Sequence, residues 1–185
     1  MARHQRTSKG KTIRPTFFVF CEGETEEAYI SLLKRIYRIP VEISPKIAGN
    51  RITRKYIRNT MQSKPEHPKD KIFLLYDLDV PEMLEKLRSI PDTILLASNP
   101  CFELWYILHY VNHSHAISSA ECVGKFERIC HEYKKGKIPC TLGAKLNENI
   151  EKAVGRAKKL PLYENPSTSV YLLIDEIEEA RKKMI

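Results

Sequence analysis

The sequence lacks a long hydrophobic run. Its longest apolar stretch, residues 104–111, is far shorter than the roughly 20 residues that a membrane-spanning helix needs, and it contains His109. The apolar residues 17–20 are too few for the hydrophobic region of a secretory signal peptide, and Glu22 follows them almost at once. We therefore expect no membrane association and no export, which predicts a cytoplasmic protein.

Cysteines paired at short spacing are also missing. The chain has five cysteines and no CxxC motif: Cys21, Cys101, Cys122, Cys130 and Cys140. An odd number of cysteines without a secretory leader predicts reduced thiols in the cytosol. The last three cysteines and His131 could be grouped into a zinc site, but the short ligand spacings of structural zinc sites are absent. We interpret the cysteines as small buried hydrophobic residues.

Two histidines have a spacing that is compatible with zinc, because His109 and His113 stand four residues apart in a predicted helix. The metalloprotease pattern requires a Glu between them, and the sequence has none. We therefore expect structural roles for both.

The first fifteen residues contain no acidic side chain. They do carry basic side chains, at Arg3, Arg6, Lys9, Lys11 and Arg14. We interpret residues 1–15 as a flexible basic arm, which is either a solvated terminus or a segment that contacts nucleic acid. The whole chain has 31 Lys and Arg against 23 Asp and Glu, a formal net charge of +8. Such a charge favours a polyanionic partner.

No internal repeat interrupts the chain, and 185 residues with 42% hydrophobic side chains suit one domain with a single core. Runs of apolar residues predict buried strands at 16–21, 41–46, 71–76 and 93–97. Helical spacing between them predicts a helix that is capped by Thr25 and ends before Pro40, and further helices at 51–62, 81–87 and 102–111. This alternation predicts an α/β fold, with a mainly parallel four-stranded sheet flanked by helices.

The pattern changes beyond residue 112. Helical spacing recurs over residues 119–134, 145–159 and 169–183, and we expect no strand there. Residues 136–143, which include Pro139 and two glycines, predict a mobile loop. The predicted organisation is therefore a basic arm at 1–15, an α/β domain at 16–112, and a helical C-terminal part at 113–185 packed on the same domain.

Acidic side chains follow two of the predicted strands. Glu22 comes directly after the first strand, and Asp77 and Asp79 follow the third. The carboxyl ends of parallel strands share one edge of a sheet, where open α/β sheets bind their ligands. Crowded carboxylates repel one another unless a cation joins them, and hard oxygen ligands select Mg²⁺ or Mn²⁺. We therefore predict a metal site at Glu22, Asp77 and Asp79, in which Glu22 is either a ligand or the general acid or base.

Two further acids are candidates for the same site. Glu26 lies in the first turn of the first predicted helix, and Glu103 in the first turn of the helix after the fourth strand. Both could instead only stabilise a helix start, and the Asp-x-Asp pair could merely cap a loop. Asn99 could bind a phosphate, but we favour a role for it as the N-cap of a helix.

Basic residues gather around the second predicted strand and the helix that follows it. They are Lys46, Arg51, Arg54, Lys55 and Arg58. They could neutralise a phosphate backbone near the acids, which would make binding strongly salt-dependent. The alternative is a solvated helix face.

Four successive motifs resemble those of RloB-like proteins. They are FVFCEGETE at 18–26, YDLD at 76–79, SNPCFELW at 98–105 and NPSTSV at 165–170. The motifs occur in order across most of the chain, and the basic leader also fits. RloB-like proteins belong to the wider Toprim group, in which a Glu after the first strand and an Asp-x-Asp after the third form the Mg²⁺ site. The resemblance implies a Toprim-like fold with Glu22, Asp77 and Asp79 as the metal ligands.

The same resemblance implies a setting in prokaryotic restriction or antiphage loci, including abortive infection. We expect a Mg²⁺-dependent nuclease that acts on RNA, including tRNA, or on DNA. A non-catalytic nucleic-acid-binding or regulatory effector is the alternative, and nucleotidyl transfer is a third possibility. The chain lacks the ATPase region of some Toprim nucleases, so we expect that any such partner is a separate protein.

Overall fold

A computed structural model describes residues 14–182 except 38 and 40. The predicted basic arm lies outside the described residues, apart from Arg14 and Pro15. The strands are β1 (Thr16–Cys21), β2 (Glu42–Ile47), β3 (Lys71–Asp77), β4 (Ile94–Asn99) and β5 (Ser167–Thr168). The helices are α1 (Glu24–Ile36), the 3-10 turn η1 (Gly49–Arg51), α2 (Arg54–Met61), α3 (Pro81–Arg88), α4 (Glu103–Tyr110), α5 (Ser119–Ile129), α6 (Cys140–Glu148), α7 (Ile150–Ala157) and α8 (Tyr171–Lys182).

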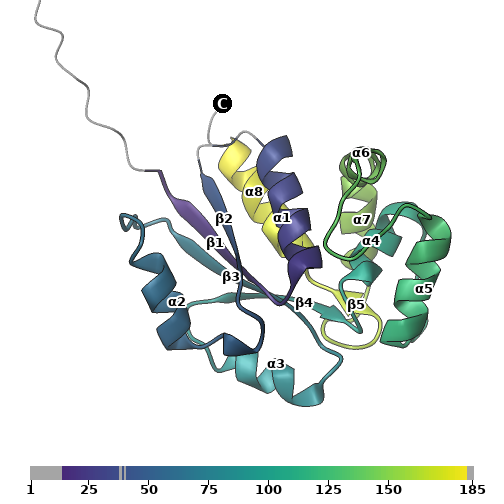
Figure 1. Cartoon of the computed structure of the whole chain (residues 1–185), viewed down its shortest axis with the longest axis horizontal. Coiled ribbons are helices and arrows are strands. Elements are labelled where there is room, and N and C mark those ends of the chain that lie inside the picture. Colours follow the sequence, from purple (N-terminus) through teal and green to yellow (C-terminus); the bar gives the residue numbers. More distant parts are fainter. Residues whose placement is uncertain (1–13, 38, 40, 183–185) are drawn as a thin grey trace, which may run out of the picture.

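The strands form one sheet in the order β2-β1-β3-β4-β5 (Figure 1). β1 to β4 pair with one another in parallel, and β5 is antiparallel to β4. The predicted α/β class, the mainly parallel sheet and the helical C-terminal part are confirmed. The prediction of no strand after residue 112 was wrong, because the two polar residues of β5 carry no apolar signal. β5 is held by a contact of 2.9 Å between the Ser98 and Thr168 hydroxyl oxygens.

Both faces of the sheet are covered, because every residue of β1 is buried. Phe17 and Val19 belong to the larger hydrophobic cluster, which includes side chains of α1, α4 and α8. Phe18 and Phe20 point to the other face and pack in a smaller cluster under α2 and α3. Figure 1 shows the same layers, with α1 and α8 on one side of the sheet and α2 and α3 on the other. This alternation explains why the β1 sequence is a continuous apolar run.

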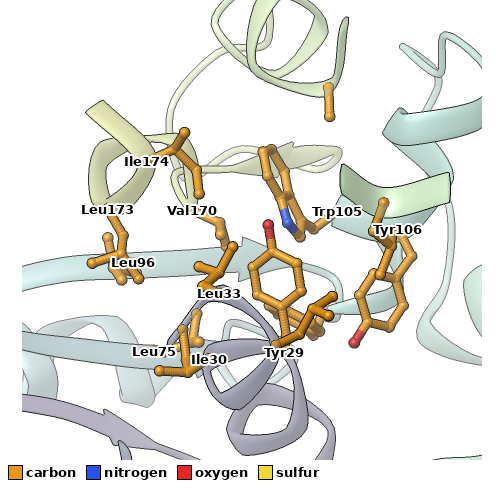
Figure 2. Close-up of a cluster of buried hydrophobic side chains, with 14 of the residues drawn as sticks. Tyr29, Ile30, Leu33, Leu75, Leu96, Trp105, Tyr106, Val170, Leu173 and Ile174 are labelled. Atoms are coloured by element: carbon orange, nitrogen blue, oxygen red, sulfur yellow. The ribbon is translucent and has the colours of Figure 1, made fainter. Parts of the chain in front are cut away.

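Aromatic rings join α1 to α4. The Tyr29 ring centroid lies 5.6 Å from that of Phe102, 6.2 Å from that of Trp105 and 5.9 Å from that of Tyr106. Figure 2 shows Tyr29 between Trp105 and Tyr106, with Leu33 of α1 nearby. Tilted and edge-on ring pairs of this kind stabilise a core beyond the area that they bury. The two helices are therefore fixed relative to each other.

The C-terminal helices are shorter than predicted. The helix expected at 119–134 ends at Ile129, and the one expected at 145–159 is two helices, α6 and α7, that meet at Asn149. The loop predicted over residues 136–143 is wrong for its second half, because α6 begins at Cys140. Pro139 stands just before this helix as its N-cap residue, so here proline marks a helix start.

The interpretation of the cysteines as small buried hydrophobic residues is confirmed for Cys21, Cys101 and Cys122. It is wrong for Cys140, which is exposed, and for Cys130, which is partly exposed. All five lie in the described ranges, and each is a free thiol. Among the helices of residues 14–182 as described, none is long and apolar enough to cross a bilayer.

His109 is a buried neutral histidine. Its side chain is 1% exposed, and Nδ1 donates a hydrogen bond to the Trp105 carbonyl oxygen over 2.8 Å. Burial lowers the pKa of His109 to about 4, and the positive charge of Arg156 acts in the same direction. The ring therefore resists protonation in the folded state.

Acidification should destabilise the protein through His109. Below pH 6.5 the unfolded chain binds a proton at this ring and the folded chain does not, so stability falls until about pH 4. The loss amounts to at most about 3 kcal/mol. Urea unfolding at several pH values isolates this contribution: the stability difference between wild type and His109→Asn should change with pH over this range, whereas the difference between wild type and His115→Asn, an exposed control, should not. Parallel pH profiles for wild type and His109→Asn would contradict the assignment.

Candidate functional site

The parallel pairing of β1 with β3 brings Glu22 and Asp77 together. Cys21 is level with Leu75 in the register, and the Glu22 backbone N–H donates to the Leu75 carbonyl oxygen over 3.0 Å. The Asp77 backbone N–H in turn donates to Glu22 Oε2 over 2.9 Å. The Glu22 side chain therefore bends toward the end of β3 and is held there by the backbone of a second acidic residue.

Glu26 lies in the first turn of α1, where it is only 5% exposed. Its Oε2 accepts a hydrogen bond of 3.0 Å from the backbone N–H of Gly23, the N-cap residue. Thr25 is therefore not the N-cap, contrary to the prediction. The hydrogen bond from the Gly23 N–H to Glu26 stabilises the helix start, which is the alternative role that the sequence analysis gave to Glu26. A catalytic role for this side chain stays a prediction.

Glu103 lies in the first turn of α4 and is 2% exposed. Its Oε1 accepts a hydrogen bond of 2.5 Å from the hydroxyl of Tyr133, a residue between α5 and α6. Sequence reasoning missed Tyr133, because it fell inside a predicted helix with no signal that linked it to an acid. A buried carboxylate needs such a donor, and this one comes from the C-terminal part of the chain.

Asp79 is exposed, whereas one oxygen of Asp77 is not. Leu78 lies between them, and its backbone N–H donates to the Ser98 carbonyl oxygen over 2.8 Å, which ties this segment to β4. Asp77 Oδ1 is buried and has no hydrogen-bond partner. A buried oxygen without a donor is costly, and a bound cation is one group that would satisfy it.

The acids act on one another electrostatically. The pKa of Asp77 is raised well above its ordinary value, first by burial and then by the negative charges of Glu26, Glu22, Glu103 and Asp79. All four carboxylates are therefore close enough to Asp77 to oppose its ionisation.

Two of the neighbouring acids show the same effect. Burial raises the pKa of Glu26 to about 7, and the charges of Glu22 and Glu103 add to the rise. Burial also raises the pKa of Glu22. The hydrogen bond from Asp77 and the positive charge of Lys135 partly offset that rise. Sequence reasoning did not connect Lys135 with the acids.

The donor set fits a hard divalent cation in its chemistry. Glu22, Asp77 and Asp79 offer carboxylate oxygens, and one of them, Asp77 Oδ1, has no donor. As the described side chains stand, no group of three or more His, Cys, Asp or Glu is arranged so that it could hold a metal ion. The Glu22 carboxylate is turned toward the Asp77 N–H instead.

The predicted basic residues lie on β2 and on the two elements that follow it in the chain, η1 and α2. All five are exposed, with Lys46 on β2, Arg51 in η1, and Arg54, Lys55 and Arg58 in α2. The backbone of η1 lies close to the backbone of Glu22. A Cβ atom added at Gly49 would lie 3.4 Å from the Glu22 carbonyl oxygen.

Asn99 does not cap α4, contrary to the prediction, because the N-cap residue is Phe102. The Asn99 side-chain amide donates to the Tyr163 carbonyl oxygen over 3.0 Å and so ties the end of β4 to the segment before β5. Its short side chain is used to join two parts of the chain that are distant in sequence.

His109 and His113 belong to no metal site in the described part of the chain. His113 Nδ1 lies 2.9 Å from the Lys125 ammonium nitrogen, which leaves both histidines in structural contacts.

Comparison with known families identifies the family of this chain. The family model described as RloB-like protein matches residues 17–177, which include all the acids above and the C-terminal helices up to α8. Comparison with curated proteins and with solved structures gave no match.

Replacing Asp77 by Asn should stabilise the metal-free protein. The raised pKa of Asp77 means that stability is highest below its unfolded-state pKa and is lost as pH rises through the folded-state value. At neutral pH, removing this charge should raise the free energy of unfolding by about 1 kcal/mol or more. Thermal or urea unfolding in EDTA measures it, with the exposed Asp92→Asn as the control. A destabilised Asp77→Asn protein would refute the charge-crowding argument.

Replacing Tyr133 by Phe should destabilise the protein. It removes the hydroxyl donor to Glu103 Oε1 and leaves a buried carboxylate oxygen without that partner, which costs about 1–3 kcal/mol. Tyr110→Phe is the matched control, since it removes the same group from a partly exposed ring. Equal unfolding free energies for Tyr133→Phe and wild type would show that the Tyr133–Glu103 bond does not hold these elements together.

Proposed function

The chain belongs to the RloB-like protein family, and on this basis, together with the acids at one edge of its sheet, we propose that it is a Mg²⁺-dependent nuclease of the Toprim type. Its substrate is RNA, including tRNA, or DNA. The observation that supports the proposal most is the crowding of carboxylates around Asp77, whose Oδ1 is buried without a partner. A cluster of carboxyl groups whose pKa values are raised by burial and by one another's charge is typical of functional sites.

The roles of the residues follow from their places. Glu22, Asp77 and Asp79 would hold Mg²⁺, which would supply positive charge to the phosphate being cleaved. Glu103, held by Tyr133, is positioned to orient a water molecule, and Glu26 is a second candidate for proton transfer. The exposed residues Lys46, Arg51, Arg54 and Lys55 would bind the phosphate backbone.

We further propose that the protein acts in prokaryotic antiphage defence or abortive infection, as RloB-like proteins are expected to do. A partner ATPase, where one is needed, would be a separate protein encoded in the same locus. A cytoplasmic location follows from this role.

Cleavage should require the metal and the three acids. The full chain with Mg²⁺ or Mn²⁺ should cut labelled RNA, including tRNA, or DNA, and EDTA should stop the reaction. Asp77→Asn, Asp79→Asn and Glu22→Gln should each lower the rate by about 100-fold or more, since each removes charge stabilisation from the reacting phosphate. Glu82→Gln is the matched control, because Glu82 is an exposed acid at the start of α3.

Cleavage that survives in both Asp variants would rule out a nuclease site built from these acids, and with it the Toprim-type assignment. Nucleic-acid binding without cleavage by the wild type would favour the alternative, a non-catalytic effector. Titration calorimetry with Mn²⁺ measures metal binding directly, so it shows whether an absence of cleavage is due to a failure to bind the metal.

A further inference from the structure

Three lysines are concentrated in one tight turn between α5 and α6. The turn comprises Lys134–Lys137, called the lysine turn below, and the side chains of Lys134, Lys135 and Lys137 are all exposed. It is closed by a hydrogen bond of 3.0 Å from the Lys137 N–H to the Lys134 carbonyl oxygen. Gly136 has a φ of 73°, a backbone conformation that favours glycine. The turn is therefore a defined structure, and its last two residues belong to the segment 136–143 that was predicted to be mobile.

The lysine turn is packed against the start of α1. The Gly136 backbone N–H donates to the Thr25 hydroxyl oxygen over 3.2 Å. A Cβ atom added at Gly136 would lie 2.9 Å from both the Cβ and the Oε2 atoms of Glu24, which is too close for any side chain. The backbone of the turn thus lies directly on the first helical turn after β1.

The residue before the turn is fixed to α4. The hydroxyl of Tyr133 donates to Glu103 Oε1, so the chain is held at adjacent points by the helices that follow β1 and β4. Lys135 lies between these two points, and its positive charge reaches Glu22. The fold therefore presents the lysine turn at the edge of the sheet where the acids lie.

None of the three lysines forms an ion pair with a carboxylate in the part of the chain that the structure describes. Exposed ammonium groups that are held beside an acidic site, and are not ion-paired with its carboxylates, are suited to bind the phosphates of a polyanion. The alternative is that these lysines bind no ligand and only offset the negative charge of the acids.

We propose that the lysine turn binds the phosphate backbone of nucleic acid directly beside the acidic site. This inference rests on the proposed function and extends it, because the basic residues of β2, η1 and α2 lie on the other side of the acids. Lys46 belongs to β2, and α2 covers the sheet face opposite to that of α1 and α4, on which the lysine turn rests, so the two basic groups approach this edge of the sheet from different sides. A bound strand would then cross the sheet edge over the carboxylates.

Equilibrium binding of a fluorescent oligonucleotide, measured by anisotropy in EDTA, tests the lysine turn without cleavage. The Lys135→Gln/Lys137→Gln double variant should bind about tenfold more weakly than wild type. It should also lower the slope of log K against log salt by about 1.5, because two phosphate contacts are lost. Lys135→Arg/Lys137→Arg should keep the wild-type affinity.

The matched control is Lys34→Gln/Lys69→Gln. It removes the same charge from two exposed lysines, one in the last turn of α1 and one in the loop before β3, toward the opposite edge of the sheet. Its affinity and salt slope should equal those of wild type. An equal loss in both double variants would mean that only net charge matters, which overturns the inference.

The outcomes separate this inference from the proposed function. If wild type binds but does not cleave, and the lysine-turn variant alone loses affinity, the lysine turn is established and the nuclease assignment fails. If wild type cleaves, and the lysine-turn variant keeps its affinity and salt slope, the inference fails and the nuclease assignment stands. If wild type binds neither RNA nor DNA oligonucleotides, both fail.

Gly136→Ala tests the position of the turn with all charges intact. The added Cβ has to displace the turn from Glu24, so affinity should fall although the net charge is unchanged. Circular dichroism and the melting temperature show whether the variant is folded. A folded Gly136→Ala protein with wild-type affinity would overturn the requirement that the turn be seated on α1.

Discussion

The parallel pairing of β1 with β3 is the contact on which the rest of the arrangement depends. It sets Cys21 level with Leu75, so Glu22, which follows β1, and Asp77, the last residue of β3, meet at one edge. Because β1 is buried on both faces, its register is strongly determined: a shift by one residue would exchange the side chains of the two cores. The positions of the acids are therefore consequences of hydrophobic packing.

The crowded carboxylates work against stability in the metal-free protein. Burial and repulsion raise the pKa values of Glu22, Glu26 and Asp77, and each rise means that ionisation at neutral pH opposes folding. Local donors limit the penalty, since the Gly23 and Asp77 N–H groups and the Tyr133 hydroxyl each satisfy one carboxylate oxygen. Asp77 Oδ1 has no such donor. Under the proposed function, this loss of stability would be exchanged for the capacity to bind a cation.

The C-terminal part does more than cover the sheet. Tyr133 reaches Glu103, Gly136 rests on the first turn of α1, and β5 extends the sheet beside β4. These contacts bring residues after position 112 against the part of the chain that carries the acids. They also agree with the extent of the family match, which continues through residue 177. The acidic edge is thus built by the whole described chain.

The sequence alone was enough for the class of fold and for the expectation that Glu22 and Asp77 lie at one edge of the sheet, because both depend on local signals. Continuous apolar runs such as that of β1 identify buried parallel strands, and an acid directly after such a strand, such as Glu22, must lie at the carboxyl edge. Tertiary structure alone decided the rest. Four interactions join residues far apart in the chain. They are the contact of Thr168 with Ser98, the hydrogen bond from Tyr133 to Glu103, the charge of Lys135 beside Glu22 and the hydrogen bond from Asn99 to Tyr163. No periodicity records such contacts, because each depends on how separate helices and strands pack in space.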